Sequence, residues 1–134
     1  MNFKVGEINS IEEGLNEILN KELPAKPAYW LARFLISLNN EFNASEKARL
    51  NLISKYAKKD KNGNPLTLMR KDKNGKDSNE YDMADMKAFQ KEFMQLNEEE
   101  FEIDFKPIKL EMLGDIKLKP ITLARLGKII IIEE

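Results

Sequence analysis

The sequence predicts an α+β protein in which an antiparallel helical hairpin is combined with a projecting β-hairpin and a small C-terminal β-sheet. Three observations lead to this fold class. Apolar residues recur at helical spacing in two segments, two Asn-Gly pairs flank a short strand-like stretch, and apolar and charged residues alternate after residue 100. The 134 residues are expected to form a single domain, residues 1–134, around one core.

Residues 1–22 are expected to form an N-terminal strand followed by a short helix. Ser10 followed by Glu13 matches a capping box, and apolar residues at helical spacing come directly after it. This pattern predicts that the helix starts at Ser10. The residues expected to form the preceding strand are Phe3, Val5 and Ile8.

A long helix is expected over residues 27–58. Pro27 suits the first turn of a helix, because the N–H that proline lacks would have no partner there. An apolar stripe then continues to about Lys58. Asn43 and Glu46 form a second capping-box pattern, so a kink near residues 40–43 is the alternative to one continuous helix.

Residues 59–82 are expected to form the β-hairpin. They contain the one internal repeat of the chain, residues 59–63 and 71–75, and each copy ends in Asn-Gly. This pair favours tight turns, because both residues tolerate positive φ. The strands are predicted at residues 65–70 and 78–81.

A second helix is expected over residues 83–97, with Asp82 and Asp85 at its start as capping residues. Its apolar positions step by three, four and three residues, which indicates a narrow seam that packs antiparallel on the long helix. The seam residues are Met86, Phe89, Phe93 and Leu96.

Residues 100–134 are expected to form a small sheet with a short helix. Apolar and charged residues alternate from Phe101 to Phe105, as in a strand with one buried face, and Pro107 predicts a bend or an edge position. The alternation resumes with Ile108, Leu110 and Met112. A helix started by Pro120 and closed by Gly127 should precede a final strand over residues 128–134.

The composition removes most common catalytic chemistry. The chain has no cysteine and no histidine, which excludes Ser-His-Asp triads, Cys-His dyads and metal sites built from these ligands. Asp60, Asn62 and Asn64 are spaced like calcium ligands, but the glycine and glutamate that a calcium loop needs do not follow in register. We therefore expect no enzyme activity, no cofactor and no metal.

Charge is balanced over the chain but unevenly distributed along it. Twenty-two basic and 23 acidic residues give a net charge of −1, so no global field attracts nucleic acid or a membrane surface. Basic residues predominate over residues 55–76 and acidic residues over residues 80–104. The hairpin is a candidate anion or nucleic-acid contact, with a solvated turn as the alternative. Its candidate residues are Lys59, Lys61, Arg70, Lys71, Lys73 and Lys76.

Two groups of residues are candidates for a protein interface. Exposed Trp, Tyr and Arg are common interface anchors, although Trp30 could instead belong to the core. Four successive isoleucines place apolar side chains on both faces of a strand, which predicts a two-fold dimer unless the helices cover that strand. The interface candidates are Tyr29, Trp30, Arg33, Ile129, Ile130, Ile131 and Ile132.

Several short motifs occur in order between residues 23 and 126. They are Leu-Pro-Ala-Lys before an aromatic helix, Lys-Asp-Lys-Asn-Gly after it, Ala-Phe-Gln-Lys-Glu-Phe, Glu-Phe-Glu-Ile-Asp, and Leu-Gly-Asp-Ile before a proline-started helix. In these motifs the chain resembles the uncharacterised small proteins encoded by tailed bacteriophages and prophages. It departs from them in residues 1–20 and in the isoleucine run. That family has no established active residues, so the resemblance implies a phage gene expressed in the bacterial cytoplasm and nothing chemical.

These observations together favour a non-enzymatic phage accessory protein that acts through protein–protein contacts, in virion or tail assembly. One alternative is a phage-encoded inhibitor of a host enzyme or defence system, which would mimic nucleic acid through the acidic residues 80–104. Another is a nucleic-acid binder that uses the basic hairpin. The longest apolar run is residues 129–132, so we expect no export signal and no membrane span, and a cytoplasmic or virion-associated protein.

Overall fold

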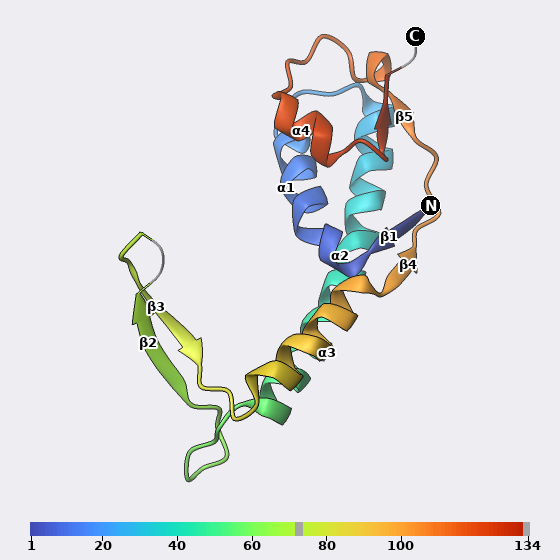
Figure 1. The fold of residues 1–134 in the computed structure, drawn as a ribbon. Helices are drawn as coiled ribbons and strands as arrows, with labels where there is room; N and C mark the ends of the chain where they lie inside the picture. Colours follow the sequence, from blue (N-terminus) through green and yellow to red (C-terminus); the bar gives the residue numbers. More distant parts are fainter. Residues whose placement is uncertain (72–73, 133–134) are drawn as a thin grey trace. The chain divides into compact units, whose positions relative to one another are not determined.

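A computed structural model describes residues 1–71 and 74–132 of the chain (Figure 1). The predicted α+β class is confirmed, with long helices and small two-stranded sheets. The elements are β1 (Asn2–Lys4), η1 (Val5–Glu7), α1 (Ile8–Leu19), α2 (Ala25–Tyr56), β2 (Thr67–Lys71), β3 (Asp77–Tyr81), α3 (Met86–Glu98), β4 (Glu100–Glu102), β5 (Ile108–Lys109), η2 (Leu110–Leu113), α4 (Pro120–Arg125) and β6 (Ile130–Ile131).

The chain divides into two compact units. Unit 1 comprises Met1–Asn43 and Glu98–Glu134, and unit 2 comprises Ala44–Asn97. The helix α2 spans Ala25–Tyr56, so its residues belong to both units and the capping-box pattern at Asn43 does not begin a separate helix. Among the described residues, no helix is both long and apolar enough to cross a bilayer.

The core of unit 1 is formed by α1, the first part of α2, and segments from both ends of the chain. β1 pairs antiparallel with β4, which places Phe3 opposite Phe101. Buried apolar side chains from all these segments form one cluster. Its members are Phe3, Ile8, Ile11, Leu15, Ile18, Leu31, Phe34, Leu38, Ile103, Ile108, Leu113, Leu126, Ile129 and Ile130.

The start of α1 differs from the prediction. The helix begins at Ile8, so the capping box at Ser10 and Glu13 is wrong as a start signal. The short 3₁₀ helix η1 leads directly into α1, and the Glu7 carboxylate accepts a hydrogen bond from the Lys4 N–H at 3.3 Å. Only Phe3 of the three expected strand residues lies in β1, because the chain coils from Val5 onward.

The C-terminal segment forms two strand pairs rather than one sheet. β4 pairs with β1, and β5 pairs with β6 in parallel, with Ile108 opposite Ile130. The alternation from Phe101 to Ile108 predicted the inward side chains correctly, since Ile103 and Ile108 are buried. Leu110 and Met112 are not in a strand, because the chain turns into η2, which carries Leu113 into the core.

The helix α4 begins with Pro120 at its first position, as predicted. It packs on α1, where Gly14 provides space for the Leu126 side chain. The buried Thr122 hydroxyl donates a hydrogen bond to the Glu17 carboxylate, which links the two helices.

Unit 2 contains the end of α2, the β-hairpin and most of α3. β2 and β3 pair antiparallel with Met69 opposite Asn79, which confirms the hairpin. Gly63 and Gly75 have φ of 81° and 77°, as the two Asn-Gly turns require. An antiparallel bridge between Ala57, directly after α2, and Met83, shortly before α3, closes the base of the β-hairpin.

The cap of α3 is Asp85 and not Asp82. The Asp85 carboxylate accepts a hydrogen bond from the Ala88 N–H at 3.1 Å, as an N-cap residue does. Asp82 instead forms an ion pair with Lys58 at 3.6 Å, while its backbone carbonyl accepts the Lys58 N–H. Asp82 therefore stabilises the base of the β-hairpin.

Candidate functional site

Tyr29, Trp30 and Arg33 lie at the surface of α2 in unit 1. The exposed fractions are 60% for Tyr29 and 36% for Trp30, so Trp30 is a surface residue rather than a core residue. The Arg33 guanidinium lies over the Tyr29 ring, 5.6 Å from its centroid. Ile36 follows on the same helical face and is also exposed.

Trp30 and Arg33 border a hollow of about 400 Å³, which we call the aromatic groove. Trp30, Arg33, Phe34 and Ser37 of α2 form one side of it, and residues 103–107, Lys109 and Met112 form the other. Its floor is rigid, because the buried Phe34 ring packs edge-on against Phe105, with centroids 4.9 Å apart.

The charges around the aromatic groove are mostly positive. Arg33, Lys106 and Lys109 line it, whereas Asp104 is the one carboxylate among its lining residues. Within residues 1–71 and 74–132, the Arg33 guanidinium forms no hydrogen bond or ion pair and interacts with the Tyr29 ring. The Lys106 ammonium forms no ion pair or hydrogen bond in the same part of the chain. The groove thus combines an aromatic floor with two cations, Arg33 and Lys106, that can pair with an anion.

The four isoleucines are divided between the core and the surface. Ile129 and Ile130 are 1% and 5% exposed and belong to the core of unit 1, so they need no second chain to cover them. Ile131 and Ile132 are 38% and 68% exposed. Only Ile130 and Ile131 lie in β6, one buried and one exposed, so this short strand carries apolar side chains on both faces, while Ile129 lies before it and is covered by the core.

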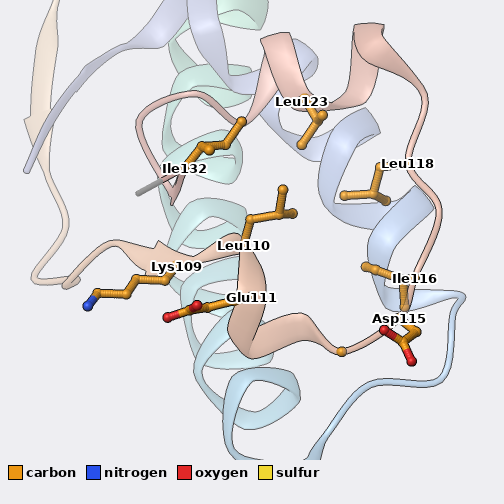
Figure 2. A pocket seen from close by; sticks show the side chains of 9 residues that line it. Lys109, Leu110, Glu111, Asp115, Ile116, Leu118, Leu123 and Ile132 are labelled. Atoms are coloured by element: carbon orange, nitrogen blue, oxygen red, sulfur yellow. The ribbon is translucent and has the colours of Figure 1, made fainter. Parts of the chain in front are cut away.

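Ile132 borders a second hollow of about 510 Å³, the aliphatic pocket. Figure 2 shows the apolar side chains of Leu110, Leu118, Leu123 and Ile132 around one open space, with Ile116 beside it. Charged side chains lie at the edge of this space. These are Lys109, Glu111 and Asp115.

Sequence reasoning found only part of these two hollows. It named Trp30, Arg33 and Ile132, but it assigned Met112 to a strand. Met112 lies instead in η2, which follows β5 directly, and Pro107 lies just before β5. Lys109 lines both hollows, so they are neighbours on the surface of unit 1.

The basic candidates of the hairpin are distributed along it. Lys59 and Lys61 are exposed near the first turn, and Lys76 is exposed after the second. Arg70 and Lys71 belong to β2, which separates these two turns. Lys73 lies outside the described residues.

Several carboxylates of the acidic stretch pair with lysines of the chain itself. In unit 2, the Lys55 ammonium lies 3.3 Å from the Glu92 carboxylate. The pKa of Glu92 is lowered by a hydrogen bond from the Tyr56 hydroxyl and by Lys55. In unit 1, Glu98 lies 2.7 Å from the Lys4 ammonium and raises the pKa of that lysine. These pairs reduce the negative charge available to an outside partner.

Comparison of the chain with protein-family models, with curated proteins and with solved structures found no match. The likeness to tailed-phage proteins therefore remains a prediction. Within the described parts of the chain, no three acidic side chains gather where they could hold a metal ion. The two hollows of unit 1 and the exposed residues beside them are the candidate functional site.

Proposed function

We propose that this chain is a non-enzymatic phage accessory protein that acts through protein–protein contacts in virion or tail assembly. The observation that supports this proposal most is the joint exposure of Tyr29, Trp30 and Arg33 beside the aromatic groove. Tryptophan, tyrosine and arginine are enriched among the few residues that contribute most of the binding energy in protein interfaces. Here they lie on α2, whose residues Leu31, Phe34 and Leu38 are packed in the core of unit 1.

The extent of the apolar surface favours a protein partner over a metabolite. The aromatic groove has a volume of about 400 Å³, and an exposed apolar residue of α2, Ile36, lies outside its lining. Ile36 is 63% exposed on α2, and Met112 is 37% exposed at the far side of the groove. A small ligand would leave these side chains in water, whereas a protein surface would cover them.

Capture of partners from phage-infected cells tests the proposal. The wild-type chain, immobilised, should retrieve one phage structural or assembly protein at near-stoichiometric level. Trp30→Ala combined with Arg33→Ala should abolish this retrieval, whereas the matched control Lys117→Ala, in an exposed loop of unit 1, should keep it. Peptide mass spectrometry of purified virions and assembly intermediates gives the second reading, and absence from both overturns the assembly role.

The same capture experiment separates the alternative class of function. An inhibitor of a host enzyme or defence system would retrieve one host protein instead of a phage protein. Nucleic-acid mimicry is the less favoured form of that alternative, because Asp82, Glu92 and Glu98 are already paired with lysines. Binding through the basic hairpin would appear as retained nucleic acid that is lost steeply as salt rises.

We further propose that the chain forms a two-fold dimer through the exposed Ile131 and Ile132, of which Ile132 lines the aliphatic pocket. Ile132→Lys should convert the dimer into a monomer without loss of the fold, as measured by light scattering after size exclusion. Ile130→Lys is unsuitable, because it would place a charge in the core. A wild-type mass near 15.5 kDa at high concentration would contradict the dimer.

A further inference from the structure

We propose that the aromatic groove binds an acidic segment of the partner protein that carries one aromatic or large aliphatic side chain. This inference deepens the proposed function and rests on it, because it states which chemistry the partner presents. The apolar side chain would enter the groove, and neighbouring Asp or Glu residues would pair with the cations at its edge.

The shape of the groove selects the apolar part of the segment. Phe34 is 1% exposed and Phe105 packs against it, so the floor cannot collapse to fill the space. Trp30, a residue that is 36% exposed, forms one wall, and Met112 adds an adaptable wall on the other side. A flat or branched apolar side chain would contact these groups, whereas a small side chain would leave the hollow unfilled.

The charge of the groove selects the acidic part. Arg33 and Lys106 have no carboxylate partner among the residues that the structure describes, and Lys109 adds a third cation. A guanidinium binds a carboxylate through two parallel hydrogen bonds, which fixes the orientation of the bound segment. Asp104 opposes this attraction, but the lining residues still carry an excess of positive charge.

The neighbouring surface supports a peptide segment rather than an isolated small anion. Tyr29, Arg33 and Ile36 lie at spacings of four and three along α2, so they form a stripe beside the groove. Tyr29 is 60% exposed and holds the Arg33 guanidinium over its ring. An extended segment could therefore place its anchor in the groove and continue along this stripe.

The first experiment is selection of binders from a random displayed heptapeptide library on the immobilised full chain. We expect enriched sequences with at least two acidic residues beside a Phe, Leu, Ile or Met. Enrichment of sequences without acidic residues, or no enrichment, overturns the proposal. The same selection on a Trp30→Ala chain should lose the consensus.

The second experiment measures affinity with the strongest selected peptide, synthesised without tryptophan or tyrosine. Trp30 is the only tryptophan of the chain, so its fluorescence reports occupation of the groove directly. Arg33→Glu with Lys106→Glu should weaken binding at least about tenfold, and replacement of the acidic residues of the peptide by Asn and Gln should have a similar effect.

A matched charge reversal provides the control. Lys117→Glu with Lys119→Glu changes the net charge equally at two exposed positions that do not line the groove, and it should alter the affinity less than about twofold. Equal weakening by both double variants overturns the groove as the site. Circular dichroism of each variant verifies that the exposed substitutions leave the fold intact.

The failures of the two proposals are distinguishable. An acidic consensus that depends on Arg33 and Lys106 supports the groove even where capture retrieves no phage protein, and then only the assembly role is overturned. The opposite result is also possible: the chain retrieves a phage protein but selects no acidic peptide. This result supports the assembly role and overturns the proposal that the groove binds an acidic segment.

Discussion

Unit 1 and unit 2 differ in how their apolar residues are covered. In unit 1, fourteen buried apolar side chains form one continuous cluster, and several of them are fully inaccessible. In unit 2, Ile53 and Ala57 are the buried apolar residues among those described, and no described side chain of α3 is buried. One unit is therefore organised around a core, and the other is organised around local interactions.

This difference indicates which interactions stabilise each unit. Unit 1 owes its stability mainly to the removal of apolar surface from water, about 25 cal/mol for each Å². Unit 2 relies on turns, a helix cap, ion pairs and the stacked rings of Phe89 and Phe93, whose centroids are 5.8 Å apart. Substitutions in unit 1 should therefore have larger effects on unfolding than comparable substitutions in unit 2.

The largest effect is expected from a pair of phenylalanine truncations. Phe34→Ala removes a fully buried ring that contacts Phe3 and Phe105, and it should lower the free energy of unfolding by about 3–5 kcal/mol. Phe93→Ala in unit 2 should cost roughly half as much, because that ring is only partly buried. Urea unfolding followed by circular dichroism measures both, and equal losses would contradict the comparison.

Gly14→Ala tests the tightness of packing inside unit 1. A Cβ at this position would lie 2.9 Å from Leu126 Cγ and 3.3 Å from Arg125 Cβ. Because Leu126 is completely buried, it cannot move aside freely, and we expect a loss of about 1–3 kcal/mol despite the better helix propensity of alanine. Thermal unfolding should show no loss for the exposed control Asn16→Ala on the same helix.

Asp85→Ala tests the local stabilisation of unit 2. The substitution removes the carboxylate that accepts the Ala88 N–H, and N-cap losses of this kind cost about 1 kcal/mol. Hydrogen exchange should accelerate at the first turn of α3 while the amides of α1 remain protected. Restoration by Asp85→Asn, which keeps a capping oxygen, distinguishes the cap from the loss of charge. Unchanged exchange in Asp85→Ala would rule out the cap as a source of stability.

The smallest effect concerns the pH dependence of unit 2. The Tyr56 hydroxyl and the Lys55 ammonium lower the pKa of Glu92 from its ordinary value of 4.5. The folded chain therefore binds this proton less readily than the unfolded chain does, so the contribution is present above pH 4.5 and is lost as the pH falls through the folded pKa.

Glu92→Gln removes this titrating group while keeping a similar shape. The variant should lose less stability than the wild type between pH 7 and pH 3, as measured by urea unfolding at each pH. An NMR titration of the Glu92 side chain gives the shift directly. A midpoint at or above 4.5 would contradict the interaction with Tyr56 and Lys55.

Local patterns predicted most elements of the fold because they act within a few residues. Apolar spacing located the helices, the Asn-Gly pairs located both turns, and alternation after Phe101 identified Ile103 and Ile108 as inward residues. The start of α1 was misplaced because Ser10 matches a capping pattern, while the preceding 3₁₀ helix depends on β1 pairing with a distant strand.

The candidate site could be predicted only in part, because it depends on contacts between distant segments. Trp30 and Arg33 were recognisable as interface residues from their chemistry. Their groove requires Phe105 and Met112 to lie against α2, and no local pattern specifies that contact. In the same way, the sequence predicts a final strand over residues 128–134, but only Ile130 and Ile131 form β6, and its pairing with β5 places Ile130 in the core.

Unit 1 is assembled from both ends of the chain, and this has a consequence for synthesis on the ribosome. β1, α1 and the start of α2 emerge before residues 44–97, whereas β4, β5 and α4 emerge after them. At roughly 5–20 residues per second, Phe3 and the apolar faces of the first helices stay uncovered for several seconds. By the end of that interval all residues of unit 2 have emerged. Unit 2 is thus the first of the two units whose residues are all available for folding, although it has the smaller core.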